Sequence, residues 1–155
     1  MDDYQFERLW QRLGKYADML TQFGAVMAPD YSLFTDWPRA IQIYNHYRKH
    51  FIGAYLQQLG MTVYPTICWS DKNSYSWCFD GEPENATVCV SSVGTQWNKE
   101  VRTLFLDGYY AMEDKLHPRT VVFHGSVPRE LSTQANIVQI GTFQEEVRER
   151  TRCLK

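Results

Sequence analysis

Two aspartates stand where apolar runs of the chain give way to polar residues, and such carboxylates can do acid–base chemistry. Asp30 follows the run 24–29, and Asp71 follows the run 62–69. If these runs are adjacent strands, the two carboxylates could share a proton or act as general acid and general base. The alternative is structural, because aspartate is also favoured in turns and at helix N-termini. The candidate catalytic residues are Asp30 and Asp71.

Small polar residues and one histidine follow the same runs and the next two. Ser91-Ser92-x-Gly94 precedes a helical stretch, where backbone N–H groups could hold a phosphate, although the lysine of a Walker loop is missing. His124 ends an apolar run and could be a general base. A plain turn and a histidine satisfied by backbone groups are the respective alternatives. The candidate ligand-binding residues are Ser32, Trp69, Ser70, Ser92, Gly94 and His124.

One pair of histidines has the spacing of metal ligands. His46 and His50 lie four residues apart on a predicted helix, but the Glu of an H-E-x-x-H motif is absent and no third ligand can be named. Arg48 and Lys49 between them would repel a cation. A solvated basic face is the interpretation we adopt, so we expect no metal and no cofactor.

The elements that position these residues alternate along the chain. Apolar runs predict strands at 24–29, 62–69, 87–92, 119–124 and 136–140. Spacings of three and four predict helices over 2–22, 37–59 and 97–116, with a last helix from Thr142 to about Arg150. Because the strands are nearly continuous apolar runs, we expect an α/β domain over residues 1–155. Its mostly parallel sheet of about five strands has helices on its faces, as an open sheet or a partial barrel.

Local signals refine this prediction. Gly14 weakens the first helix, and Asp36 caps the second at Trp37-Pro38. Pro65 inside a strand indicates an edge or a bulge. The buried stripe of the second helix is predicted to include Ile41, Tyr44, Phe51, Tyr55 and Leu59. Since ligands bind beyond the carboxyl ends of parallel strands, the polar residues named above should share one rim.

Composition limits the classes of function. The net charge of −2 is unlike that of a protein that coats nucleic acid, so nucleic-acid binding stays open only as a local patch. The first residues are acidic and polar and no apolar run approaches membrane length, so we expect a cytoplasmic protein with no membrane partner. The four cysteines form no C-x-x-C pair and are expected to be reduced, with Cys68 and Cys89 buried.

Six segments together resemble an uncharacterised domain family of bacteria, their phages and plasmids. They are DDYQFERLW (2–10), APDYSLFTDWP (28–38), IYNHYRKHFIGAYLQQLG (43–60), VYPTICWSD (63–71), FDG (79–81) and VSSVG (90–94). The motif positions are Pro29, Asp30, Ser32, Asn45, Arg48, Pro65, Thr66, Trp69, Ser70, Ser92 and Gly94. The family pattern has an apolar strand before D-D-Y, with which this chain begins. A missing strand would expose a sheet edge, so the resemblance implies a homodimer.

Two functions of different classes follow from these observations. The first is a mobile-element enzyme with its polar site at the strand ends, acting on a nucleotide or nucleic-acid component. The second is a small phage-encoded binding protein that inhibits a host protein, such as a defence nuclease. A polar pocket around Asp30, Asp71 and Ser92 would favour the enzyme, and a filled rim with an exposed apolar surface would favour the binding protein.

Overall fold

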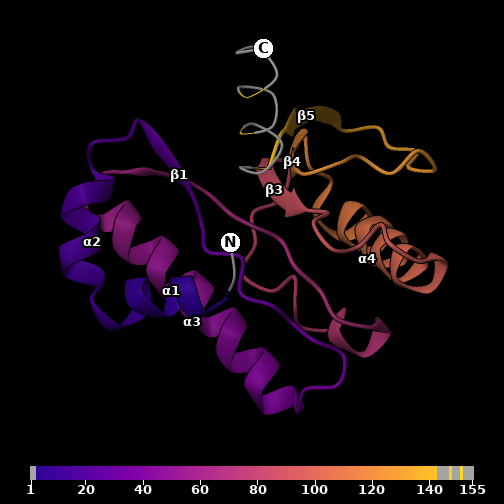
Figure 1. Cartoon of the computed structure of the whole chain (residues 1–155), viewed down its shortest axis with the longest axis horizontal. Coiled ribbons are helices and arrows are strands. Elements are labelled where there is room, and N and C mark those ends of the chain that lie inside the picture. Colours follow the sequence, from indigo (N-terminus) through magenta and orange to yellow (C-terminus); the bar gives the residue numbers. More distant parts are fainter. Residues whose placement is uncertain (1–2, 143–146, 148–150, 152–155) are drawn as a thin grey trace.

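The computed structural model of the protein describes residues 3–142 together with Val147 and Thr151. The helices are α1 (Asp3–Gln11), α2 (Leu13–Leu20), α3 (Arg39–Gln58) and α4 (Lys99–Leu116), with a short 3₁₀ helix η1 (Lys72–Ser74). The strands are β1 (Ala25–Met27), β2 (Thr62–Tyr64), β3 (Thr87–Ser91), β4 (Thr120–His124) and β5 (Asn136–Ile140). Every strand pair is parallel, which confirms the predicted α/β class (Figure 1).

The strands form two small sheets, so the prediction of a single five-stranded sheet is wrong. β1 pairs with β2, and β3, β4 and β5 form the second sheet in that order. The sheets meet at one parallel bridge between Thr66 and Cys89, where Ile67 N donates to Cys89 O and Cys89 N donates to Pro65 O. To continue this pairing toward the N-terminus of the two strands, the ladder would need an N–H from residue 65, and proline has none. Pro65 therefore marks the place where the two sheets separate.

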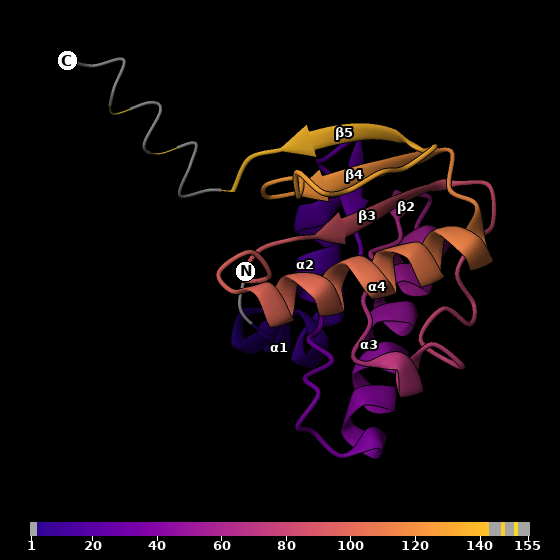
Figure 2. The same ribbon diagram turned by 90° about the vertical axis from the view of Figure 1, so that its right-hand side faces the viewer.

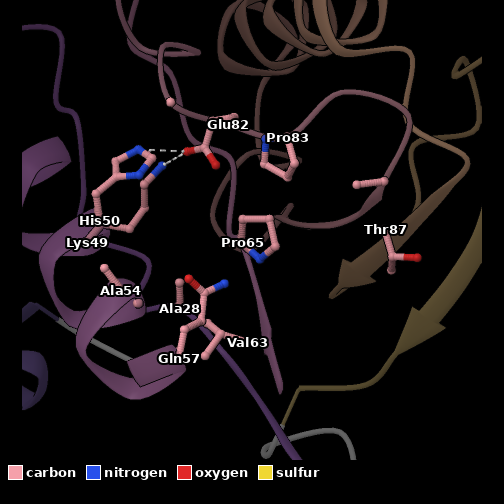
Figure 3. Close-up of a pocket in the computed structure, with 13 residues that line it drawn as sticks. Ala28, Lys49, His50, Ala54, Gln57, Val63, Pro65, Glu82, Pro83 and Thr87 are labelled. Carbon is pink, nitrogen blue, oxygen red and sulfur yellow. Dashed lines mark hydrogen bonds and ion pairs between the residues drawn. The ribbon is translucent and has the colours of Figure 1, made fainter. Parts of the chain in front are cut away.

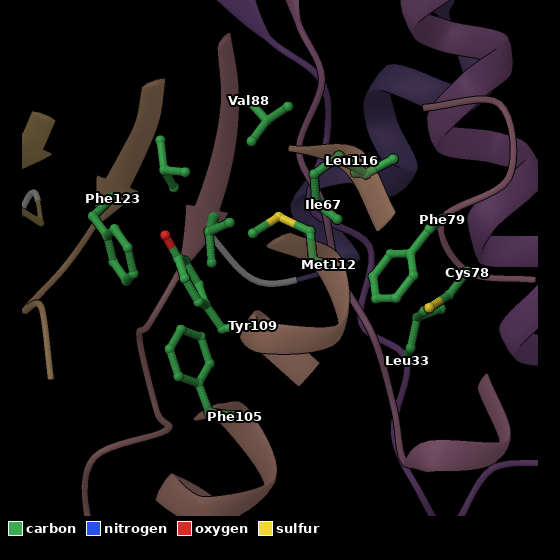
Figure 4. Close-up of a cluster of buried hydrophobic side chains, with 12 residues drawn as sticks. Leu33, Ile67, Cys78, Phe79, Val88, Phe105, Tyr109, Met112, Leu116 and Phe123 are labelled. Atoms are coloured by element: carbon green, nitrogen blue, oxygen red, sulfur yellow. The ribbon is translucent and has the colours of Figure 1, made fainter. Parts of the chain in front are cut away.

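Each sheet has a hydrophobic core against its helices. α4 runs along the sheet β3–β5, and its Tyr109 and Met112 pack against Val88 and Phe123 (Figures 2 and 4). Helices α1, α2 and α3 form a second core with Val26 and Val63 of the smaller sheet. Its fully buried members are Ala17, Tyr31, Ile52 and Leu56. Among the described strands, spatial order follows chain order, without the reversal found in doubly wound sheets.

Three helix predictions need correction. The stretch 2–22 is two helices, because the backbone leaves the helical region at Arg12 (φ −135°). α3 begins at Arg39 behind Pro38, and Asp36 provides no cap. Its predicted apolar stripe is largely exposed, with Ile41 and Phe51 at 45% and 44%. The predicted last helix from Thr142 lies almost wholly outside the described residues.

The described cysteines are free, as expected. Cys89 and Cys78 are buried and Cys68 is partly buried. Burial raises the pKa of Cys68 and Cys89 to about 12 and that of Cys78 to about 11, which keeps these thiols protonated and unreactive. Cys153 lies outside the described residues. No helix in the described part of the chain combines the length and apolar character that crossing a membrane requires.

Candidate functional site

The carboxyl ends of three strands bring together an aspartate, a serine and a histidine. Ser91 and His124 are register partners at the ends of β3 and β4, and Ser91 Oγ lies 3.5 Å from His124 Nδ1. Asp30, three residues beyond β1, lies within reach of a hydrogen bond from the Ser91 side chain, which lowers the Asp30 pKa. We call Asp30, Ser91, His124 and the neighbouring Asp3 the rim site. Strand ends of this kind carry the active sites of parallel barrels.

The second carboxylate beside Asp30 is Asp3, on α1. Burial raises the pKa of Asp30 from 3.8 to about 6; Lys49 opposes this rise, Asp3 adds to it, and the bond from Ser91 opposes it. A carboxyl group with a pKa near neutrality can both donate and accept a proton at physiological pH. The pairing with Asp71 that the sequence suggested is not among the main influences on this pKa.

A polar network holds the loop that carries Asp30. The backbone N–H and hydroxyl of Ser32 donate to Asp3 Oδ1 at 3.2 and 3.1 Å, and Asn45 Nδ2 donates to Ser32 O at 2.7 Å. Arg48 donates to Asn45 Oδ1 and to Glu7, and its guanidinium lies 4.1 Å from the centre of the Tyr31 ring. The first half of the buried face of α3 is therefore polar, because Asn45 and Arg48 anchor the 29–32 loop and α1.

The residues predicted after β2 lie apart from this network. Asp71 caps η1, since its Oδ1 accepts from Asn73 N at 3.0 Å. Trp69 packs against Phe105 and Gly108, with the Phe105 ring centre at 5.3 Å. Ser70 N donates to Ser74 Oγ, and the buried Ser70 hydroxyl has no partner among the described residues. Asp71 thus makes a capping contact and Trp69 a packing contact, and neither joins the rim site.

The predicted phosphate cradle is a turn in the structure. Ser92 Oγ donates to Ser126 O at 2.6 Å, which joins the loops after β3 and β4. Gly94 has a φ of +79°, a conformation that favours glycine. α4 begins only at Lys99, where Asn98 Oδ1 accepts from Val101 N. The helix N-terminus is thus already capped and does not directly follow the turn.

A cavity of about 470 Å³ opens where the two sheets separate, between Pro65 and Thr87 (Figure 3). Lys49 of α3 and Glu82 meet at its edge, with 2.5 Å between Lys49 Nζ and Glu82 Oε1, and Lys49 also donates to Thr66 O. Both side chains are almost completely buried. Burial alone would raise the pKa of Glu82, but the Lys49 ammonium and the nearby His50 imidazole hold it below its usual value.

This arrangement corrects the interpretation of residues 46–50 as a solvated basic face. Lys49 is 2% exposed and Arg48 is 9% exposed. Burial, with Lys49 and His50 nearby, lowers the pKa of His46 to about 4, so its imidazole is neutral at physiological pH. Glu82 could not be predicted as a partner from the sequence, because Asp80-Gly81-Glu82-Pro83 has the composition of a simple turn.

Fold and rim site together define a parallel α/β domain with a polar centre at its strand ends. The chain belongs to a family described as a domain of unknown function (DUF4417), whose model matches residues 1–143. It is 39% identical to the "Gene 1 protein" of Mycobacterium phage D29 over 125 residues, which are 81% of this chain and 46% of that protein. It is 38% identical to the "Gene 1 protein" of Mycobacterium phage L5 over 127 residues, or 82% of this chain and 56% of that protein.

The chain thus spans about half the length of these phage relatives. No solved structure matches it. The comparisons place the protein in an uncharacterised, phage-associated family.

Proposed function

We propose that the rim site is the acid–base centre of an enzyme that acts on a nucleotide or a nucleic-acid component. The observation that carries the proposal is the meeting of Asp30, Ser91 and His124 from three different strand ends, with Asp3 beside them. Groups from separate strands converge on one point only if the fold brings them there, and a partly buried cluster of ionisable groups of this kind is typical of functional sites.

Each residue of the rim site has a distinct role in this proposal. Asp30 exchanges the proton, and the Ser91 hydroxyl orients its carboxylate from the side of β3. His124, within reach of Ser91, supplies a second titratable group. Asp3 holds the Ser32 backbone and keeps the proton affinity of Asp30 high by like-charge repulsion. Asp71 is assigned to the cap of η1 and not to the reaction.

The support for a nucleotide or nucleic-acid component comes from context, since the relatives named above are phage proteins. The test is an NMR titration with nucleosides, nucleotides and short single-stranded oligonucleotides, followed by product analysis of any ligand that binds. We expect shifts in residues of the rim site, and Asp30→Asn should remove turnover while the fold persists.

Asp71→Asn is the matched control for this experiment. It should leave the cap of η1 nearly unchanged, because an asparagine oxygen caps a helix about as well as a carboxylate, and it should leave ligand binding and turnover intact. Equal loss of activity in both variants, or ligand shifts confined to residues far from the strand ends, would contradict the assignment of the rim site.

A second candidate function is supported by an exposed aromatic surface. Tyr44, Tyr47 and Phe51 of α3 are 44–52% exposed and surround Trp10, with ring centres 5.5–6.2 Å from the indole. Clustered aromatics are typical of protein interfaces. A binding protein that inhibits a host protein, such as a defence nuclease, would use this surface, and Tyr47→Ser would then abolish capture of the host protein while Asp30→Asn would not.

A further inference from the structure

The two histidines of α3 and the carboxylate of Glu82 form a cluster separate from the rim site. His46 and His50 lie one turn apart, with ring centres at 4.4 Å. Glu82, from the turn before β3, lies beside the histidines at the edge of the cavity. His50 Nε2 is 3.1 Å from Glu82 Oε1 (Figure 3). One ligand atom from each of the three residues lies within 4.8 Å of the other two.

The hydrogen bonds of the cluster leave ligand atoms unused. His46 Nε2 lies 3.2 Å from the carbonyl oxygen of Asp80, to which it can only donate, so Nδ1 carries the lone pair. His46 Nδ1 and Glu82 Oε2 are buried and have no hydrogen-bond partner among the described residues. Metal-binding histidines typically donate their second ring N–H to a carbonyl or carboxylate in this way.

We propose that His46, His50 and Glu82 bind a divalent transition-metal ion of the zinc class. Two imidazoles and one carboxylate are a common zinc ligand set, and with three protein ligands the fourth position stays open. Here that position faces the cavity, which His50 and Glu82 both line. A water molecule or an oxygen atom of a ligand in the cavity would complete the coordination.

The main objection to a cation here is the ammonium of Lys49. Lys49 Nζ already donates to Glu82 Oε1 and to Thr66 O, so it is held on one oxygen of the carboxylate. The other oxygen, Oε2, is left for the ion. Glu82 would then bridge Lys49 and the metal, which satisfies both of its oxygens and removes the orphaned acceptor that the buried side chain now has.

The ligand atoms must move closer together to bind the ion. At metal–ligand distances of about 2.1 Å, tetrahedral ligand atoms are about 3.4 Å apart, so a separation of 4.8 Å in the cluster must shorten by about 1.4 Å. The side chain of His50 is 32% exposed and faces open space on the cavity side, so a small rotation of its ring provides this movement.

The test uses the full chain without a histidine tag and Zn²⁺ and Co²⁺ as probes. Titration calorimetry should give one Zn²⁺ per chain, and bound Co²⁺ should show the visible absorption of a tetrahedral site. Zn²⁺ should also raise the melting temperature. His46→Gln, His50→Gln and Glu82→Gln should each weaken Zn²⁺ binding at least tenfold. Circular dichroism of the metal-free variants identifies any that fail to fold.

His117→Asn is the matched control, because His117 is an exposed histidine whose left-handed conformation asparagine tolerates. It should bind Zn²⁺ as the wild type does, and so should Cys153→Ser. The proposal fails if the wild type binds no stoichiometric Zn²⁺, or if a folded His50→Gln variant binds Zn²⁺ as tightly as the His117→Asn control.

Discussion

At the scale of single residues, the ionisation of Asp30 links the rim site to stability. The folded chain holds the Asp30 proton up to pH 6, whereas the unfolded chain releases it near pH 4. The stabilising contribution of this group is therefore present at low pH and is lost as the pH rises through about 6. Asp30→Asn removes that loss, so we expect the variant to be more stable than the wild type at pH 7.5 by about 1–3 kcal/mol.

Urea unfolding at pH 4 and at pH 7.5 measures this difference. At pH 4 the two proteins should have nearly equal free energies of unfolding, because the wild-type carboxyl is then neutral when folded. A variant that is less stable than the wild type at pH 7.5 would show that Asp30 serves the fold more than the chemistry of the rim site.

For the buried ion pair of Lys49 and Glu82 we expect the opposite effect, a loss of stability on substitution. Lys49→Met leaves the Glu82 carboxylate buried without its partner, and the loss should be about 3–5 kcal/mol in the free energy of unfolding. Lys115→Met removes an exposed pair with Asp80 and should cost less than about 1 kcal/mol. Denaturant unfolding of the two variants compares them directly, and similar losses would mean that the buried ion pair has no special weight.

Sequence reasoning located part of the rim site and missed the rest for a physical reason. Asp30 and His124 follow apolar runs, and the rule for parallel sheets places such residues on one rim. Asp3 belongs to a helix that reaches the rim site only through tertiary packing, and Lys49 and Glu82 meet at the cavity in the same way. In the first half of α3 the apolar residues indicate the wrong face, because polar groups that anchor the 29–32 loop occupy the buried face there.

At the scale of elements, the apolar runs predicted where each strand lies, but not that β1 and β2 are only three residues long or how the strands group into sheets. The structure has β3, β4 and β5 within one residue of the predicted ranges. The division into two sheets depends on a hydrogen bond that Pro65 cannot make, and the sequence showed Pro65 only as an irregularity. The cavity beside Lys49 and Glu82 lies where the two sheets separate. Pro65 therefore shapes both the fold and a potential site.

Two helical glycines give a prediction for the packing of these elements. At Gly108 of α4 a methyl group would overlap the indole of Trp69, whereas at Gly53 of α3 its nearest neighbour would be Val63 Cγ1 at 3.8 Å, an ordinary contact. Gly53→Ala should stabilise the protein by about 0.5–1 kcal/mol through helix propensity. Gly108→Ala should destabilise it by about 1–3 kcal/mol through overpacking. Thermal unfolding of both variants provides the comparison, and a stabilised Gly108→Ala would mean that Trp69 is free to move.

At the scale of the whole molecule, the helices cover one face of the strands and leave much of the other open. Val121 and Phe123 face the core with α4, so Val122 and its register partner Val138 face the opposite side. Met27 and Tyr64, which are also register partners, lie on that side in the smaller sheet. Met27, Tyr64 and Val138 are 42%, 37% and 43% exposed. In the relatives, about half of the chain lies beyond the matched part.

We expect this open face to drive self-association. Exposed apolar side chains on a strand surface favour pairing with another chain, and β1 and β5 each have only one strand neighbour among the described residues. Light scattering after size exclusion should give a mass above the 18.2 kDa of one chain as concentration rises.

Val138→Lys should restore the monomer, because a charge on a strand surface opposes pairing. Tyr47→Lys, on the exposed side of α3, is the matched control and should leave the association unchanged. If Tyr47→Lys dissociates the complex and Val138→Lys does not, the aromatic surface of α3 is the interface. A mass of one chain at every concentration would exclude self-association through either surface.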